Sequence, residues 1–374
     1  MNFDLLNHTI LLNVAGSRSY GIHKQDSDID VKGVCIPPPR YVLGCLSKFE
    51  QVDAPRHIAT FESILSKDQL EIVRREKLEG TVYTLQKFLR LAADSNPNII
   101  ESLFCRDQEI LLCTTEGELL RENRHLFLSA KAKHTFSGYA FSQLNRIKRH
   151  RSWLLNPPGS KPTRPDFGLP EIPDRHFKEI KDAIQKKMDS WEWDFGTLSH
   201  SEILALKERL SEQMSEMKLA KDETWQRAAA SIGASSDLIH HIIQEKKYLN
   251  AMQNWKKYLS WKRSRNPARA ALEERFGYDT KHATHLVRLL RMGVEILTHG
   301  EVHVWRGDID AEELCHIRSG GWTYEKLIEW AEQKQVDLDA KYKKQDFAVP
   351  HTPDIDAIDA LCVRILTHSL CPSK

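Results

Sequence analysis

The stretch that decides the fold is Asn13-Val-Ala-Gly-Ser-Arg-Ser-Tyr-Gly21, followed after four residues by Asp26-Ser-Asp-Ile-Asp-Val-Lys-Gly-Val34. Apolar runs at residues 9–14 and 29–36 predict two short strands, and the residues between them predict a polar turn. The second run ends at three consecutive prolines, which do not extend a strand inside a sheet. The chain therefore opens with two strands around a turn.

The two parts of this stretch suit phosphoryl chemistry. Side chains alternate along a strand, so Asp28 and Asp30 are expected on the same side of the second strand. Carboxylates so placed can bridge two divalent cations about 3.5–4 Å apart, which activate an attacking hydroxyl. The Gly16-Ser17 turn offers backbone amides and a hydroxyl to triphosphate oxygens, and Arg18 adds positive charge. The alternative is a solvated acidic turn after a strand-ending glycine.

These residues resemble the DNA polymerase beta type nucleotidyltransferase superfamily, whose signature is a Gly-Ser turn followed by a D-x-D or D-x-E strand. The chain is more similar to predicted nucleotidyltransferases associated with bacterial RNA repair operons, like the YcgL-like family. Further segments carry the resemblance, at residues 85–92, 96–101, 137–140 and 281–290. It covers residues 9–153 and about 278–330.

The resemblance implies a third carboxylate on a later strand, for which Glu79 is the candidate because it stands between Leu78 and Gly80. The chain departs from the family pattern here, since Glu replaces the more usual Asp and Gly80 is not bulky. Glu71 and Glu76 are rivals. Without a third carboxylate the acceptor would be poorly activated, and the chain would bind nucleotides without turning them over.

Three basic side chains on a later segment form a second candidate site. Lys281, His285 and Arg288 are spaced i, i+4 and i+7, so one helix would present them on one face. The resemblance implies that this helix closes the nucleotide cleft and offers cations to the phosphates. The alternative is a solvated basic stripe.

The periodicity changes from mixed to helical near residue 125, which predicts an α+β protein. We expect a polymerase-beta-like nucleotidyltransferase core, a small mixed sheet with helices, at residues 1–125. A mainly helical region, residues 126–374, would line the cleft. A proline-rich stretch at residues 156–173 marks a helical insertion at about 157–270, with helices over 175–193, 201–229 and 236–265.

Two segments are rich in cations. Residues 131–151 carry six Lys or Arg and no acid, and residues 255–265 interleave Trp and Tyr with Lys and Arg. The first segment predicts a basic helix, and the second suits RNA or single-stranded DNA. The alternative for the second segment is that its aromatic side chains are core and its cations solvated.

Composition limits the class of protein. The formal net charge of +2 does not by itself indicate a nucleic-acid-binding protein. The 7 cysteines have no C-x-x-C spacing, which argues against a zinc ribbon. Reduced thiols, no membrane-length apolar run and no signal peptide predict a cytoplasmic protein with no membrane partner. The oligomeric state cannot be read from the chain.

The sequence therefore predicts a nucleotidyltransferase that moves a nucleoside monophosphate from a nucleoside triphosphate to an acceptor hydroxyl and releases pyrophosphate. The catalytic and metal-binding residues would be Asp28, Asp30 and Glu79, with Mg²⁺ or Mn²⁺ as cofactor. An RNA 3′ end is the favoured acceptor. The alternative is a nucleotide-binding regulator or toxin-antitoxin component, protein nucleotidylylation included, with little or no polymerising activity.

Overall fold

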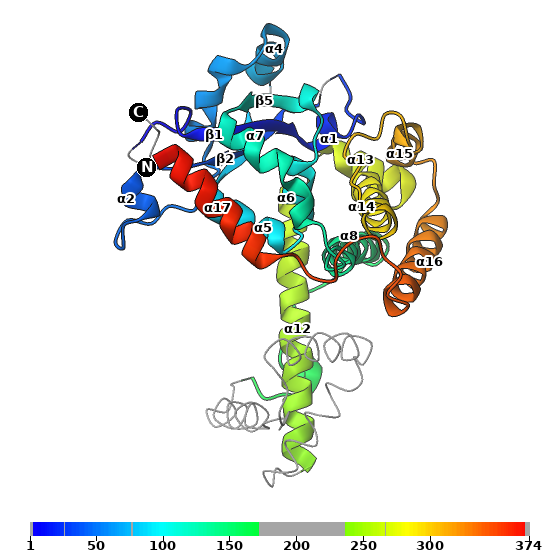
Figure 1. The fold of residues 1–374 in the computed structure, drawn as a ribbon. Coiled ribbons are helices and arrows are strands. Elements are labelled where there is room, and N and C mark those ends of the chain that lie inside the picture. The colour runs from blue at the N-terminus through cyan, green and yellow to red at the C-terminus, as the bar shows by residue number, and fades with distance from the viewer. Residues whose placement is uncertain (1–2, 26, 76–77, 172–235, 266, 371–374) are drawn as a thin grey trace. The chain divides into compact units, whose positions relative to one another are not determined.

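The computed structural model describes residues 3–25, 27–75, 78–171, 236–265 and 267–370 (Figure 1). The helices expected over 175–193 and 201–229, and the rival carboxylate Glu76, lie outside the described residues. The chain divides into two compact units, residues 1–155 with 267–374 and residues 156–266. The first unit contains the residues of the predicted site, while the functional boundary at residue 125 stays a prediction.

A five-stranded mixed sheet forms the centre of the first unit. Its strand order is β3-β4-β2-β1-β5. The β2–β4 pair is parallel, and the β1–β2, β1–β5 and β3–β4 pairs are antiparallel. The strands are β1 (Thr9–Ala15), β2 (Asp30–Cys35), β3 (Gln51–Val52), β4 (Glu79–Thr84) and β5 (Ile110–Cys113). This sheet, with helices around it and a mainly helical C-terminal region, confirms the predicted fold class.

Each face of the sheet has its own hydrophobic core. Val31 and Val82 point into a smaller core with Phe61, beneath η1 (Ala59–Ile64) and α3 (Pro55–Ile58). Val34, on the opposite face of β2, belongs to a larger core. That core is built from α5 (Leu85–Ala93), α6 (Pro97–Leu103), α8 (Ala132–Leu155) and α14 (Thr280–His299). The face of β2 that carries Val34 is therefore the one covered by helices from both ends of the chain.

Helix α14 is defined by its caps and by an apolar stripe. The Asp279 carboxylate accepts hydrogen bonds from the backbone amides of Lys281 and His282, which satisfies two free donors of the first turn. The helix ends at Gly300, whose φ of 68° is left-handed. It packs along α8, so the segment that returns after residue 266 becomes part of the first unit.

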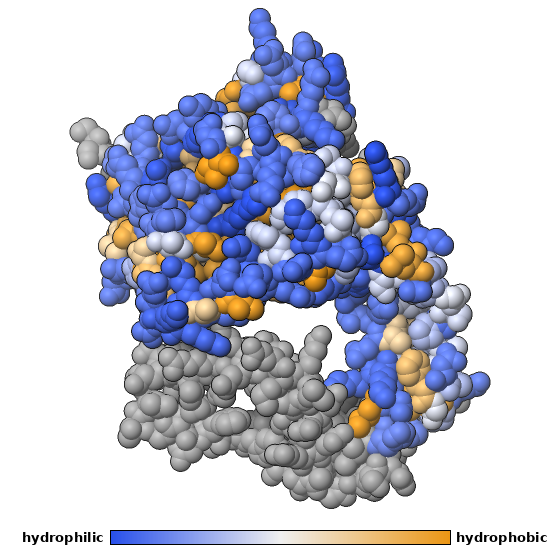
Figure 2. Space-filling view, turned by 90° about the vertical axis from the view of Figure 1, so that its right-hand side faces the viewer, coloured by the Kyte–Doolittle hydropathy of each residue, from blue (hydrophilic) through white to orange (hydrophobic). Residues whose placement is uncertain are grey.

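Further helices complete the first unit. The N-terminal half adds α1 (Gly16–Ser19), α2 (Pro39–Val42), α4 (Lys67–Arg75), η2 (Asp107–Glu109), α7 (Thr115–Glu122) and η3 (Arg124–Phe127). The C-terminal part adds α13 (Pro267–Phe276), α15 (Ala311–Arg318), α16 (Tyr324–Lys343) and α17 (Ile355–Leu370). On the face that Figure 2 turns to the viewer, hydrophilic residues predominate over the described part of the chain, with apolar side chains scattered among them. Among the helices of the described residues, none combines the length and apolar character that crossing a membrane requires.

The second unit contains η4 (Pro165–Phe167) and the long helix α12 (Ser236–Ser264). An ion pair of 2.6 Å between Arg164 and Glu245 joins the two elements. Tyr258 on α12 is buried, as expected if the aromatic residues of this segment are core, and the ring centroids of Trp255 and Tyr258 are 5.8 Å apart.

Candidate functional site

The turn after β1 lies directly against the carboxylate of Asp30. Gly16 follows Ala15, the register partner of Asp30, and has a φ of 68°. A Cβ added to Gly16 would lie 2.5 Å from Oδ2 of Asp30. Glycine is therefore required here twice, for the backbone conformation and for the space that the carboxylate occupies.

Glu79 is the neighbour of Asp30 on the other side. The first residue of β4 is Glu79, and the parallel register pairs it with Asp30. Directly paired residues in adjacent strands point to the same face of the sheet, so both carboxylates belong to one surface. The rival Glu71 lies on α4, outside the sheet.

The pKa of Asp30 reports a concentration of negative charge. Burial raises the pKa of this carboxyl, and the neighbouring charges of Asp28 and Glu79 raise it further. Lys281 and Lys32 act in the opposite direction and lower it. Two carboxylates and two ammonium groups thus act on the half-buried carboxyl of Asp30.

The structure corrects the placement of Asp28 on the strand. β2 begins at Asp30, so Asp28 is an exposed residue of the preceding loop. The Arg18 side chain holds this loop, since Nε donates to the carbonyl of Asp28 at 3.1 Å and Nη2 to that of Ser27 at 2.6 Å. These two backbone carbonyls engage the guanidinium that was expected to face phosphate.

The donor set at this edge of the sheet suits a hard divalent cation. Carboxylate oxygens are the ligands that Mg²⁺ and Mn²⁺ prefer, and the mutual repulsion at Asp30 is what a bound cation would relieve. Within the described ranges, no three acidic, His or Cys side chains converge tightly enough to form a complete metal site. Asp28, Asp30 and Glu79 therefore fit the cation in chemistry and neighbourhood, and closing around it requires side-chain movement.

A cavity of about 510 Å³ opens beside these carboxylates. Its walls come from the turn after β1, from β2 and β4, from the segment after β3 and from α6. The lining residues are Ala15, Gly16, Tyr20, Asp30, Val31, Lys32, Asp53, Pro55, Glu79, Gly80, Thr81 and Asn98.

Lys32 and Tyr20 are cavity residues that the sequence analysis did not single out. Lys32 follows Asp30 by two positions, so strand alternation places both on one face, and that signal was sufficient to find it. Its Nζ donates to the carbonyl of Asn98 at 3.1 Å, and burial lowers its pKa. Tyr20 has no comparable signal, because its position depends on contacts with distant segments.

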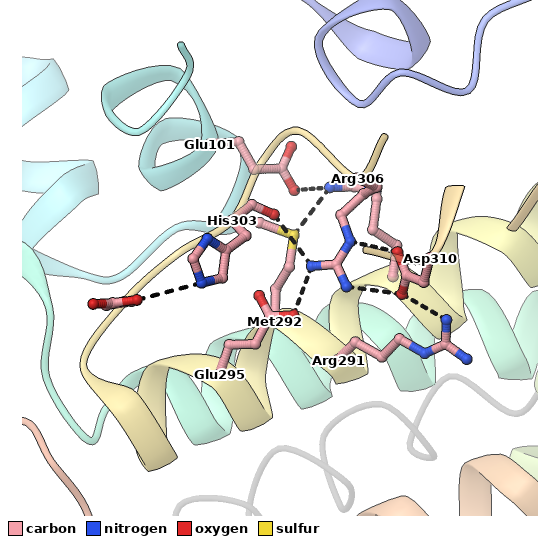
Figure 3. A network of polar contacts seen from close by, with 9 residues as sticks. Glu101, Arg291, Met292, Glu295, His303, Arg306 and Asp310 are labelled. Carbon is pink, nitrogen blue, oxygen red and sulfur yellow. Dashed lines mark hydrogen bonds and ion pairs between the residues drawn. The ribbon is translucent and has the colours of Figure 1, made fainter. Parts of the chain in front are cut away.

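Those contacts centre on the buried Arg288, which was expected on the cleft wall. Its guanidinium is 2.6 Å from Glu101 and lies over the ring of Tyr20, 3.5 Å from the centroid. The Tyr20 hydroxyl donates to the other oxygen of Glu101 at 2.5 Å. Figure 3 shows Glu101 and Met292 in this network. Only 1% of Arg288 is exposed, so in this structure it contacts Glu101 and Tyr20 and does not face solvent.

The other two predicted residues of α14 lie closer to solvent. Lys281 is exposed and acts on the charge of Asp30. His285 is half-buried, and its pKa is lowered to about 3 by burial and by the charge of Arg288. A neutral His285 accepts a hydrogen bond at Nδ1 from Nη2 of Arg288, at 2.9 Å. The three residues therefore differ in depth, because the apolar stripe of the helix includes position 288.

A second buried arginine holds the chain just after the turn. The Arg306 backbone amide donates to the carbonyl of Tyr20 at 3.0 Å, while its guanidinium pairs with Glu295 at 2.6 Å and Asp310 at 2.7 Å (Figure 3). The Trp305 ring lies against Gly21, where a Cβ would meet it at 3.0 Å. Residues 305–310 thus fix the far end of the segment that begins at Gly16.

Four of the six cations expected on residues 131–151 are paired with acids in three dimensions. Acidic residues of other helices and loops pair with them: Lys131 with Asp94, Lys133 with Asp339, Lys148 with Glu332 and Arg151 with Glu325. The sequence shows no acid within this helix because its counter-ions come from elsewhere in the chain.

Comparison with known proteins agrees with the motif. Residues 6–154 match the model of the RlaP family, described as the RNA repair pathway DNA polymerase beta family. The predicted resemblance is thereby confirmed, although residues 278–330 lie outside the match. No curated protein and no solved structure matches the chain.

Proposed function

Because residues 6–154 of this chain belong to the RNA repair pathway DNA polymerase beta family, we propose that the protein is a metal-dependent nucleotidyltransferase. It would transfer a nucleoside monophosphate from a nucleoside triphosphate to an acceptor hydroxyl and release pyrophosphate. One observation carries the proposal: the Gly16 turn, Asp30 and Glu79 follow one another across β1, β2 and β4 in register.

Each element of this row has a chemical role. The backbone of Gly16 and Ser17 binds the β and γ phosphates, which can approach closely because residue 16 has no side chain. Asp28, Asp30 and Glu79 would hold Mg²⁺ or Mn²⁺, which lowers the pKa of the attacking hydroxyl and neutralises the departing pyrophosphate. A carboxylate oxygen of the exposed Glu79 accepts a hydrogen bond from the acceptor hydroxyl and orients it.

The basic residues divide into two groups. Lys281 is exposed, and its positive charge acts on Asp30, so we assign it to binding the phosphates. Arg18, His285 and Arg288 act indirectly, because they contact the loop before β2 and the buried network around Glu101. The catalytic domain would comprise residues 1–125, and residues 126–374 would line the cleft, with the insertion at about 157–270.

An RNA 3′ end is the acceptor we propose, since the family is described by its RNA repair pathway. We place the reaction in the cytoplasm, in line with the free thiols of the described cysteines. Four of the six cations at residues 131–151 are paired with acids, which argues that RNA approaches from another surface.

One observation favours a second candidate, a nucleotide-binding regulator or toxin-antitoxin component with little turnover. The candidate for the third carboxylate, Glu79, is a Glu where the family more usually has an Asp. A site that never closes around the cation would bind the triphosphate and leave its α-phosphate intact.

The test is transfer of label from each α-labelled nucleoside triphosphate to total RNA or to protein, with Mg²⁺ or Mn²⁺. Asp30→Asn and Glu79→Gln keep the shape of the side chains and remove their charge, while Asp337→Asn on α16 serves as the matched control. Label lost in the first two variants and retained in the third supports the enzyme. Triphosphate binding by the wild-type chain without transfer to either acceptor supports the regulator.

A further inference from the structure

The face of β2 that carries Asp30 also carries an ammonium group deeper in the fold. Along this face, exposure decreases from Asp28, which is exposed, through the half-buried Asp30 and Lys32 to Val34, which is fully buried. Lys32 therefore lies at the floor of the cavity, where the polar site meets the larger core.

The ammonium of Lys32 is only partly satisfied. It has three N–H donors, and within the described part of the chain Nζ makes one hydrogen bond, to the carbonyl of Asn98. The negative charge of Glu101 acts on Lys32, but the Glu101 carboxylate already accepts hydrogen bonds from Arg288 and Tyr20. Burying an ammonium without full hydrogen bonding is costly, so a partner supplied by a ligand would offset that cost.

The register fixes where such a ligand would lie. Lys32 pairs with Asn13 and Asp30 with Ala15, so Lys32 is two residues, about 7 Å, from Asp30 on the side away from the Gly16 turn. A triphosphate with its β and γ phosphates at the turn would pass its α-phosphate over Asp30 toward Lys32.

We propose, resting on the proposed function, that Lys32 contacts the substrate and donates to the non-bridging oxygens of the α-phosphate. During transfer, the acceptor hydroxyl gives its proton to a carboxylate oxygen of Glu79 and its oxygen bonds to the α-phosphorus. The bond from phosphorus to the pyrophosphate oxygen breaks, and pyrophosphate leaves with that electron pair. Negative charge increases on the non-bridging oxygens at that moment, and a fixed cation beside them stabilises the transition state. Lys32 itself neither gains nor loses a proton.

The experiment separates the α-phosphate from the rest of the triphosphate. The binding of two probes in Mg²⁺ is measured calorimetrically, with α,β-methylene ATP as the complete ligand and inorganic pyrophosphate as the mimic of the β and γ phosphates. The variants are Lys32→Met, which keeps the length of the side chain, Lys32→Arg, which keeps the charge, and Lys87→Met on α5 as the control. Lys87 is paired with Glu50 outside the cavity.

We expect Lys32→Met to weaken the binding of the nucleotide analogue by roughly ten- to a hundredfold. The variant's affinity for pyrophosphate should stay within about twofold of the wild-type value. Lys32→Arg should recover part of the loss, and the thermal midpoint of each variant identifies misfolding. If a folded Lys32→Met variant loses affinity equally for both probes, or for neither, the assignment of Lys32 is overturned while the proposed function stands. A wild-type chain that binds neither probe overturns the proposed function as well.

Discussion

The guanidinium of Arg288 lies over the ring of Tyr20, 3.5 Å from its centroid, and thereby joins α14 to the segment that follows the Gly16 turn. The same guanidinium neutralises Glu101 on α6. Three segments far apart in the sequence thus share one buried charge.

Removal of that charge should destabilise the first unit. Arg288→Met leaves the buried Glu101 carboxylate without its partner, and we expect a loss of about 3–5 kcal/mol in the free energy of unfolding by urea. Adding Glu101→Gln should recover part of this loss, since the uncompensated charge is then absent. Lys148→Met breaks a surface pair and should cost less than about 1 kcal/mol. Equal effects of the buried and surface substitutions would contradict the role of Arg288.

Gly16→Ala tests the contact between the turn and Asp30. The added Cβ would strain a left-handed residue by about 1–2 kcal/mol and displace the Asp30 carboxylate, so nucleotide transfer should fall at least about tenfold. Gly138→Ala on α8 is the matched control. Among the described residues, no atom beyond its own turn of helix lies within 4 Å of the new Cβ, and the substitution should stabilise the helix by roughly 0.5–1 kcal/mol. A Gly16→Ala variant with normal transfer would show that the turn does not position Asp30.

His285 should make stability depend on pH. Burial and Arg288 lower its pKa from 6.5 to about 3, with His282 and Lys32 acting in the same direction and Glu101 opposing them. The unfolded chain therefore binds a proton near pH 6.5 that the folded chain does not bind until about pH 3. The stability that neutral His285 contributes is present above pH 6.5 and decreases as pH falls, by at most about 1.4 kcal/mol per pH unit.

The measurement is urea unfolding at several pH values between 7 and 4. Below pH 6.5, wild type should lose stability more steeply than His285→Gln, whose side chain does not titrate. Parallel curves for the two proteins would mean that His285 is protonated in the folded state as readily as in the unfolded state.

Lys281→Met should weaken triphosphate binding. The side chain is exposed and acts on Asp30, so we expect a loss of roughly three- to tenfold that diminishes at high salt. Lys148→Met removes a charge of the same sign that is already paired with Glu332, and the affinity should stay unchanged. If both variants bind equally well, Lys281 does not reach the phosphates.

The sequence was most informative where the outcome depends on local geometry. Strand alternation and the Gly-Ser turn led to Asp30, an inference that needs only the periodicity of a strand. The family resemblance, with the position between Leu78 and Gly80, led to Glu79, which the register pairs with Asp30. The first residue of β2 was less predictable. The strand begins at Asp30, and Asp28 lies in the preceding loop, where its backbone carbonyl accepts a hydrogen bond from Arg18.

Long-range pairing was beyond local patterns. The spacing of Lys281, His285 and Arg288 gave a common helix face, but their depth depends on distant segments. Arg288 is buried against Glu101 of α6 and Tyr20, whereas Lys281 stays exposed. Likewise the cations of α8 looked available until Asp94, Asp339 and Glu332 were placed around them.

The discontinuity of the first unit has a consequence for its biosynthesis. When the first 155 residues have left the ribosome, the turn and the carboxylates are present, but Glu101 still lacks Arg288 and Tyr20 lacks the residues that hold it. The ribosome must therefore add 133 further residues, from 156 to 288, before Arg288 can neutralise this buried charge. At about 5–20 residues per second, that interval lasts several seconds to half a minute, during which the polymerase-beta-like segment is exposed to chaperones and proteases in an incomplete form.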